Sequence, residues 1–184
     1  MGFDAVILAG GAARRLGGAD KATIEVGGRT LLARVLDAVA AAARVVVVGP
    51  RRPGSRAIKW VQERPPGGGP VHALAAGTSV VEQPLVVAVA VDLPFVTTAV
   101  IERLLAAVGD HDAAVVRDSA GTPLPLLGAY RSARLRARLE GLGGTAGAAM
   151  RDVLAGMDVV FVDDHEASLD CDTWEQVEAA RKRE

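Results

Sequence analysis

The chain has 184 residues, of which 50% are hydrophobic and only 3% are aromatic. Its 21 lysines and arginines against 22 aspartates and glutamates give a formal net charge of −1, which excludes the basic excess of a protein that binds bulk nucleic acid. The single cysteine, Cys171, excludes a disulfide framework and a cysteine-based zinc site within one chain.

The hydropathy pattern contains no uncharged apolar run that reaches the roughly 18 residues of a membrane helix. The first residues do not resemble a signal peptide, because Asp4 precedes a short apolar run. We therefore expect a single domain over residues 1–184, located in the cytoplasm, with neither nucleic acid nor membrane as a partner.

Strands alternate with helices along most of the chain, judged from hydrophobic periodicity. In chain order we expect a strand at 3–10, a helix at 30–43, strands at 44–49 and 57–62, a helix at 71–83, a strand at 84–92, a helix at 97–108, strands at 112–118 and 123–131, helices at 132–142 and 145–157, a strand at 158–163 and a helix at 173–184. This alternation predicts a parallel sheet between two layers of helices.

Three of these segments carry a more specific expectation. The segment 84–92, PLVVAVAVD, is the most uniformly apolar strand, so we expect it at the centre of the sheet. The prolines of 123–131 place that strand at an edge of the sheet, or else fall in its first residues. Gly77 weakens the prediction of a helix at 71–83.

Residues able to do chemistry follow the strands. Residues 10–21 come after the first strand, Asp92 ends the central one, and Asp170 and Asp172 precede the last helix. In parallel α/β sheets, ligands bind beyond the carboxyl ends of the strands, often where the strand order reverses. The sequence therefore predicts one site at that edge of the sheet.

The loop at 8–21, LAGGAARRLGGADK, combines glycines with two arginines and a lysine, which suits an anionic ligand such as phosphate. It does not match two common phosphate-binding motifs. The adjacent glycines at 10 and 11 break the Gly-x-Gly-x-x-Gly spacing of a dinucleotide fingerprint. A P-loop requires Gly-Lys-Ser/Thr, whereas Lys21 stands in Asp-Lys-Ala.

A third pattern fits. Leu-Ala-Gly-Gly at 8–11, followed by Arg15 and Lys21, resembles the signature loop of nucleotidyltransferases that activate sugars and cofactors, and we call residues 8–21 the signature loop. The two glycines let backbone N–H groups face a triphosphate. The two cations offset the charge that develops as pyrophosphate leaves.

Four more segments resemble, in order, motifs of the molybdenum cofactor guanylyltransferases: GPVHALAAG at 69–77, VDLPF at 91–95, PLPLLGAYR at 123–131 and LDCDTWEQVEAA at 169–180. The resemblance implies a three-layer α/β/α, Rossmann-like nucleotidyltransferase fold with a mostly parallel central sheet. It implies transfer of GMP from GTP to the terminal phosphate of molybdopterin (the organic part of the molybdenum cofactor), with release of pyrophosphate and with Mg²⁺ as cofactor. Molybdoenzyme-maturation proteins are further partners that it implies.

The resemblance also assigns roles to individual residues. It makes the catalytic residues Arg15, Lys21 and Asp92, the nucleotide-binding residues Leu8, Ala9, Gly10, Gly11, Lys21, Glu63, Arg64 and Asp92, and the metal ligands Asp92 and Asp172.

The metal expectation depends on two aspartates, since carboxylate oxygen is the ligand that Mg²⁺ prefers. The alternative for Asp92 is a carboxylate that accepts backbone N–H bonds in a turn. The alternative for Asp172 is the N-cap of the last helix, backed by Thr173, which forms a capping-box signature with Gln176. The family carries asparagine at the positions of Asp170 and Asp172, so both are departures from its pattern.

Base selectivity stays open at this point. Relatives carry an acidic residue that reads the guanine edge, and either Glu63 or Arg64 aligns with it. The alternatives are transfer from CTP to molybdopterin, activation of another phosphorylated metabolite, and a nucleotide-binding regulator without turnover. The leaving-group cations together with a metal ligand favour a transferase over a regulator. We expect His72 to pack or to face solvent.

Overall fold

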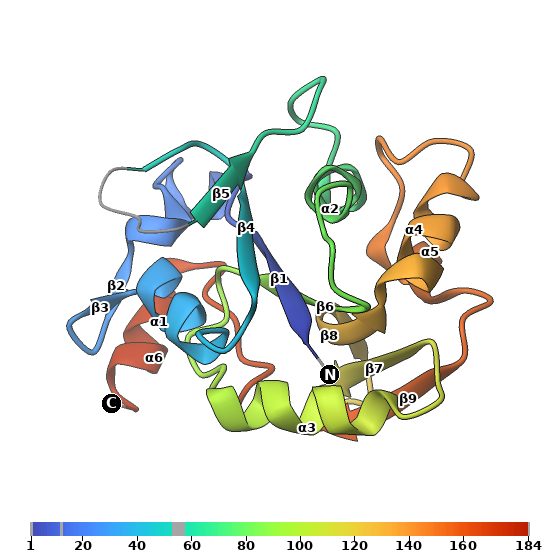
Figure 1. Cartoon of the computed structure of the whole chain (residues 1–184). Coiled ribbons are helices and arrows are strands. Elements are labelled where there is room, and N and C mark those ends of the chain that lie inside the picture. The colour runs from blue at the N-terminus through green and yellow to red at the C-terminus, as the bar shows by residue number, and fades with distance from the viewer. Residues whose placement is uncertain (1, 12, 53–57, 184) are drawn as a thin grey trace.

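The computed structural model describes residues 2–11, 13–52 and 58–183. Its elements in chain order are β1 (Phe3–Leu8), the short 3-10 helices η1 (Arg14–Leu16) and η2 (Lys21–Thr23), β2 (Glu25–Val26), β3 (Arg29–Thr30), α1 (Leu31–Ala38), β4 (Arg44–Val48), β5 (Ile58–Val61), α2 (Pro70–Thr78), β6 (Leu85–Ala90), α3 (Thr98–Val108), β7 (Ala113–Arg117), β8 (Pro123–Arg131), α4 (Ser132–Glu140), α5 (Met150–Leu154), β9 (Val159–Asp163) and α6 (Trp174–Arg181) (Figure 1).

Within the described residues, seven of the strands form one sheet in the order β5-β4-β1-β6-β8-β7-β9. All neighbouring pairs are parallel except those of β8, which runs antiparallel to both β6 and β7. The expected mostly parallel sheet is therefore confirmed, and β6 lies at its centre as expected. The strand order reverses between β1 and β6, because β4 and β5 continue on one side of β1 and the later strands on the other.

Two hydrophobic cores lie on opposite faces of this sheet, since side chains alternate between the faces along each strand. Ala5 and Ile7 of β1 pack with residues of α1, α3 and α6, whereas Val6 and Leu8 pack with residues of α2, α4 and α5. Figure 1 shows the same arrangement, with α2, α4 and α5 on one side of the strands and α1 and α3 on the other. The three-layer α/β/α architecture is confirmed.

The prolines of β8 mark the start of a strand and not an edge of the sheet. The edge position is wrong, because β8 lies between β6 and β7. Pro123 is the first residue of the strand, and the pairing of β8 with β6 begins only at Leu127. Pro125 falls where the pairing of β8 with β7 shifts register, so it removes no ladder hydrogen bond from the centre of the sheet.

Glycines explain several differences between the expected and observed helices. Gly77 lies inside α2 at a position where a Cβ would meet Val6 Cγ1 at 2.5 Å, so the glycine lets this helix pack close to β1. The helix expected at 145–157 is confined to α5, because Gly147 and Gly156 adopt φ values of +75° and +79° on either side of it. The hairpin of β2 and β3 was not expected, although its Gly-Gly turn is a recognised hairpin signal.

No helix among residues 2–11, 13–52 and 58–183 is long and apolar enough to cross a membrane.

Candidate active site

The signature loop leaves the sheet between two neighbouring strands. The buried Leu8 carbonyl accepts a hydrogen bond from Val91 N at 3.0 Å, and the N–H of the buried Ala9 donates to Val48 O at 2.9 Å. The loop therefore begins at the carboxyl end of β1, with the ends of β4 and β6 on either side of it. This is the reversal point of the strand order, where ligands of α/β sheets bind.

A second backbone segment comes very close to the start of the loop. Gly49, directly after β4, has a φ of +148°, and a Cβ there would lie 2.8 Å from the Ala9 carbonyl oxygen. Only glycine fits both the backbone conformation and this contact. Gly10 and Gly11 follow and are exposed, and Gly11 has a φ of +127°. The sequence indicated the glycines of the loop, whereas the requirement for Gly49 depends on the neighbouring strand.

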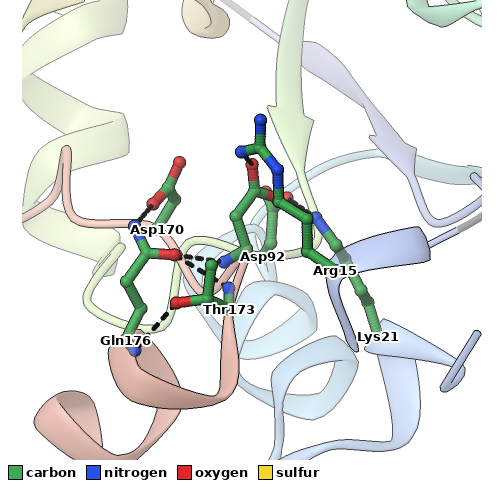
Figure 2. Close-up of polar contacts among 7 residues, drawn as sticks. Arg15, Lys21, Asp92, Asp170, Thr173 and Gln176 are labelled. Carbon is green, nitrogen blue, oxygen red and sulfur yellow. Dashed lines mark hydrogen bonds and ion pairs between the residues drawn. The ribbon is translucent and has the colours of Figure 1, made fainter. Parts of the chain in front are cut away.

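Lys21 lies at the centre of a cluster of charged side chains. Its Nζ donates to Asp92 Oδ2 at 2.7 Å and to Asp172 Oδ1. Arg15 Nη1 lies 3.8 Å from Asp172 Oδ2, and the Arg15 side chain is 75% exposed. Figure 2 shows Lys21 and Arg15 reaching the cluster from the signature loop and Asp92 from the turn after β6. The expected catalytic and metal-binding residues thus lie together, at the edge of the sheet that the sequence indicated.

A backbone hydrogen bond and a helix cap place Asp172. Cys171 N donates to Asp92 O at 2.9 Å, which joins the segment before α6 to the turn after β6. Thr173 is the N-cap of α6 and forms the expected capping box with Gln176 (Figure 2). The alternative that Asp172 caps this helix is wrong, because its carboxylate contacts Lys21 instead.

Asp170 lies beside the cluster. Among the described residues, its side chain forms no hydrogen bond with Lys21. Its Oδ1 accepts from Gln176 Nε2 at 2.6 Å (Figure 2). Burial raises the pKa of Asp170, and the negative charges of Asp172 and Asp92 raise it further. Asp170 therefore supports the cap of α6, while Asp92 and Asp172 carry the contacts with the lysine.

The electrostatics of the cluster keep Lys21 positively charged. Burial lowers the pKa of Lys21, but the carboxylates of Asp92 and Asp172 raise it by more, so its pKa lies above the ordinary value. The Lys21 and Asp92 side chains are 20% and 19% exposed, so water screens their attraction less than it screens a surface pair. The site presents a charged ammonium to an incoming anion.

The residues present fit Mg²⁺ as part of a nucleotide complex. The carboxylates of Asp92 and Asp172 both contact one cationic group, the Lys21 ammonium, so they already converge on a positive charge. Among the described residues no group of three or more histidine, cysteine or acidic side chains is arranged to hold a metal alone. Mg²⁺ does not require one, because it is commonly bound by one or two carboxylates together with substrate phosphates and water.

Glu63 and Arg64 do not belong to the Lys21 cluster and lie in the loop between β5 and α2. Glu63 Oε1 accepts from Gly67 N at 2.7 Å, and the carbonyl of Arg64 accepts from His72 Nε2 at 3.1 Å. In the part of the chain that the structure describes, neither side chain has a hydrogen bond or ion pair with the Lys21 cluster. We call residues 63–69 the base loop, after the role expected for Glu63 or Arg64.

His72 links the base loop to a second glycine-rich segment, a role that the sequence did not indicate. Its Nδ1 lies 2.7 Å from Thr145 Oγ1, and Gly147 N donates to Gly68 O at 2.8 Å. The half-buried ring therefore packs between two loops, which is the first of the two alternatives expected for His72, packing or facing solvent. The contact with Thr145 could not be expected, because the sequence pattern places that residue at the start of a helix.

Comparison with known proteins places the chain in a family. Residues 5–164 match the MobA-like NTP transferase domain. A probable molybdenum cofactor guanylyltransferase of Natronomonas pharaonis is 32% identical over 121 residues, which are 61% of this chain and 60% of that protein. The chain spans less than two thirds of the length of the first relatives it matches.

Two solved structures show the same fold across nearly the whole chain. The molybdopterin-guanine dinucleotide biosynthesis protein A of Archaeoglobus fulgidus has a TM-score of 0.76 and 22% identity, covering 98% of this chain and 97% of its own. The 2-C-methyl-D-erythritol 4-phosphate cytidylyltransferase of Thermus thermophilus has a TM-score of 0.76 and 23% identity, covering 100% and 98%. The Rossmann-like nucleotidyltransferase fold is confirmed, and with the match over residues 5–164 the chain belongs to the MobA-like NTP transferase domain family.

Proposed function

We propose that this protein transfers GMP from GTP to the terminal phosphate of molybdopterin and releases pyrophosphate. The observation that carries the proposal is the contact of the Lys21 ammonium with both Asp92 and Asp172 beside the glycine-rich signature loop. Such a site combines exposed backbone and cations for a triphosphate with carboxylates for a divalent metal. Several relatives are named molybdenum cofactor guanylyltransferases, which supports this acceptor.

The proposed reaction requires no covalent bond to the protein. An oxygen of the acceptor phosphate forms a bond to the α-phosphorus of GTP, the bond from that phosphorus to the oxygen of the β-phosphate breaks, and pyrophosphate leaves. A phosphate monoester is already nucleophilic at neutral pH, so the site needs no general base. Catalysis then rests on positioning and on neutralising the negative charge of the leaving group.

Lys21 and Arg15 have different parts in this reaction. The Lys21 ammonium has three donors, so it can exchange its contacts with the carboxylates for contacts with phosphate oxygens at the same place. Arg15, more exposed and at the rim, suits the departing pyrophosphate. Mg²⁺ held by Asp92 and Asp172 would supply further neutralisation of phosphate charge.

A different donor nucleotide is the main alternative. The base loop presents a carboxylate and a guanidinium close together in sequence, and one of the solved structures with this fold is a cytidylyltransferase. Transfer from CTP, or to another phosphorylated acceptor, would use the same Lys21 cluster. The half-buried Lys21–Asp92 contact disfavours a regulator without turnover, because mere binding of a nucleotide does not need a clamp for the leaving group.

The experiment is thermal unfolding of the purified full chain with Mg²⁺ and GTP, CTP, ATP or UTP in turn. A ligand that binds only the folded protein stabilises it by about 2.7 kcal/mol at a hundredfold excess over Kd. We expect the largest rise in Tm with GTP, followed by pyrophosphate release once molybdopterin is added. A preference for CTP would change the donor, and no shift with any nucleotide would contradict the proposal.

A lysine variant tests the role of the cluster. We expect Lys21→Ala to lower kcat by about 100- to 1,000-fold, with a smaller effect on the affinity for GTP. Lys59→Ala is the matched control, because Lys59 is an exposed lysine on β5. Equal effects of the two variants would show that the loss follows from net charge and not from the site.

Three further expectations belong to the same proposal: that residues 1–184 act as one domain, that the protein works in the cytoplasm, and that molybdoenzyme-maturation proteins receive its product.

A further inference from the structure

Arg52, which follows β4, contacts both ends of the signature loop. Its Nε and Nη2 donate to Asp20 Oδ2 at 2.8 Å and to Asp20 Oδ1 at 2.6 Å, a bidentate pair. The same Nη2 donates to the carbonyl of Ala9 at 3.1 Å. Ala9 lies at the start of the signature loop and Asp20 near its end, so one guanidinium joins the two ends of this loop.

The position of Arg52 is fixed by its other surroundings. Nη1 donates to the carbonyl of Pro50 at 3.1 Å, and the guanidinium carbon lies 5.7 Å from the centre of the Trp60 ring. The Arg52 side chain is only 14% exposed. A planar fork of this kind is better ordered than an ammonium, because its donors point in fixed directions. All three nitrogens of the guanidinium thus donate to protein oxygens, so Arg52 acts through the loop.

Asp20 links the Arg52 guanidinium to the short helix that begins at Lys21. Its Oδ1 also accepts from Ala22 N at 3.1 Å, and its carbonyl accepts from Thr23 N at 3.0 Å, so it caps the short helix η2 that begins at Lys21. The hydrogen bonds from Arg52 lower the pKa of Asp20, which keeps the carboxylate charged. Fixing Asp20 therefore fixes the first turn of η2, from which the Lys21 side chain reaches Asp92.

We propose that Arg52 is a positioning residue that closes the signature loop between Ala9 and Asp20 and so orders the loop and Lys21 before the nucleotide binds. The inference rests on the proposed function for its ligand, a nucleoside triphosphate, and on the contacts above for its geometry. Nucleotide phosphates can reorder an unclamped loop, but the ordering then reduces the affinity. The loss therefore falls on Kd and KM, whereas kcat at saturation changes little.

The first measurement is amide hydrogen exchange of residues 13–23 in the protein without nucleotide. We expect Arg52→Ala to speed exchange in this segment by about tenfold or more while β6 stays protected. Arg52→Lys keeps a cationic donor but loses the planar, two-pronged guanidinium. We therefore expect its exchange rate to lie between those of the wild type and Arg52→Ala. Arg51→Ala is the matched control, because it removes an adjacent arginine that is exposed, and we expect no change.

The second measurement is the split between affinity and turnover. If the loop of Arg52→Ala is in the binding geometry about one tenth of the time, Kd for Mg²⁺-GTP rises about tenfold, with kcat within about threefold of the wild type. Asp20→Asn should cause much of the same loss, and combining it with Arg52→Ala should add little. A purely structural role would lower Tm without this split.

Several results would overturn the inference. Unchanged loop exchange in Arg52→Ala, an equal effect of Arg51→Ala, or a fall in kcat with Kd unchanged would each do so. If Arg52→Ala does not fold, Arg52→Lys and Arg52→Gln carry the comparison. If the wild type binds no nucleotide, the proposed function fails, while the exchange data alone decide whether Arg52 orders the loop.

Discussion

The Lys21 cluster and the base loop differ in the groups that hold them together, which are charged side chains in the cluster and largely backbone atoms in the loop. The cluster joins charged side chains from three distant segments, since Lys21 is 71 residues from Asp92 and 151 residues from Asp172. In the base loop each of these contacts includes a backbone atom: Gly67 N donates to the Glu63 carboxylate, His72 Nε2 donates to the Arg64 carbonyl, and Gly147 N donates to the Gly68 carbonyl. The types of charged side chain in a cluster indicate which chemistry it can perform, whereas contacts made through backbone atoms indicate only the shape of a loop. The transfer reaction is therefore easier to infer than the base that is transferred.

The largest expected effect is on kcat, and it should differ between the two aspartates of the cluster. We expect Asp92→Asn to lower kcat by about 100- to 1,000-fold, because its half-buried carboxylate contacts Lys21 and is the better metal ligand. Asp172→Asn should cost less than about tenfold, since Asp172 is more exposed and asparagine can still offer an oxygen. Steady-state pyrophosphate release at several Mg²⁺ concentrations measures both. Equal losses would show that the two aspartates are equivalent.

A glycine substitution tests whether the start of the signature loop also depends on a backbone contact, the close approach of Gly49 to Ala9. Gly49→Ala should destabilise the fold by about 1–3 kcal/mol, because the new Cβ meets the Ala9 carbonyl in a strained conformation. Gly121→Ala is the control, since Gly121 has a φ of +80° with no atom within 4 Å of a Cβ. Urea unfolding of both variants separates the contact from the conformational strain. A loss in Gly49→Ala no larger than in Gly121→Ala would remove the role of the close approach.

Substitutions in the base loop should change selectivity and leave turnover intact. One oxygen of the Glu63 carboxylate accepts from Gly67 N, and the group has further acceptor capacity for a guanine edge. We expect Glu63→Gln to lower the preference for GTP over CTP, in kcat/KM, by about tenfold. Arg64→Ala should leave this ratio unchanged. The opposite pattern would assign the base contact to Arg64.

The smallest effect concerns pH. Hydrogen bonding to Arg52 lowers the pKa of Asp20, so the carboxylate stabilises the fold above its unfolded-state pKa of about 4, and the stabilisation is lost as the pH falls through the lower, folded-state value. The Asp20 side chain is 44% exposed, so the contribution should be below about 1 kcal/mol. Comparison of Tm for the wild type and Asp20→Asn between neutral and acidic pH measures it. A gap that does not narrow on acidification would contradict this account.

Much of the fold and of the charged cluster could be predicted, for a topological reason. Parallel strands end at one edge of a sheet, so the positions of Lys21 and Asp92 after two apolar strands were enough to bring them together. The capping box of Thr173 and Gln176 was readable because it is local in sequence. What followed from order along the chain, or from a few adjacent residues, was therefore accessible.

The rest depends on contacts between segments that the sequence does not pair. The Asp20–Arg52 contact and the close approach of Gly49 require knowledge that β4 lies beside β1. The extent of α5 depends on glycines that adopt positive φ, which a helical pattern does not reveal. The base loop is the extreme case, since its contacts join backbone atoms to residues that the sequence pattern does not pair with them.

The bond from Cys171 N to Asp92 O has a consequence for biosynthesis. A ribosome releases Lys21 first, Asp92 later and Asp172 last. In a nascent chain that has already paired β1 with β6, we expect Lys21 to contact Asp92 first and Asp172 only when the segment before α6 docks. Such long separations in sequence make the last contacts slow to form. The charged cluster is therefore complete only after the segment before α6 has docked, and an intermediate without that segment lacks Asp172.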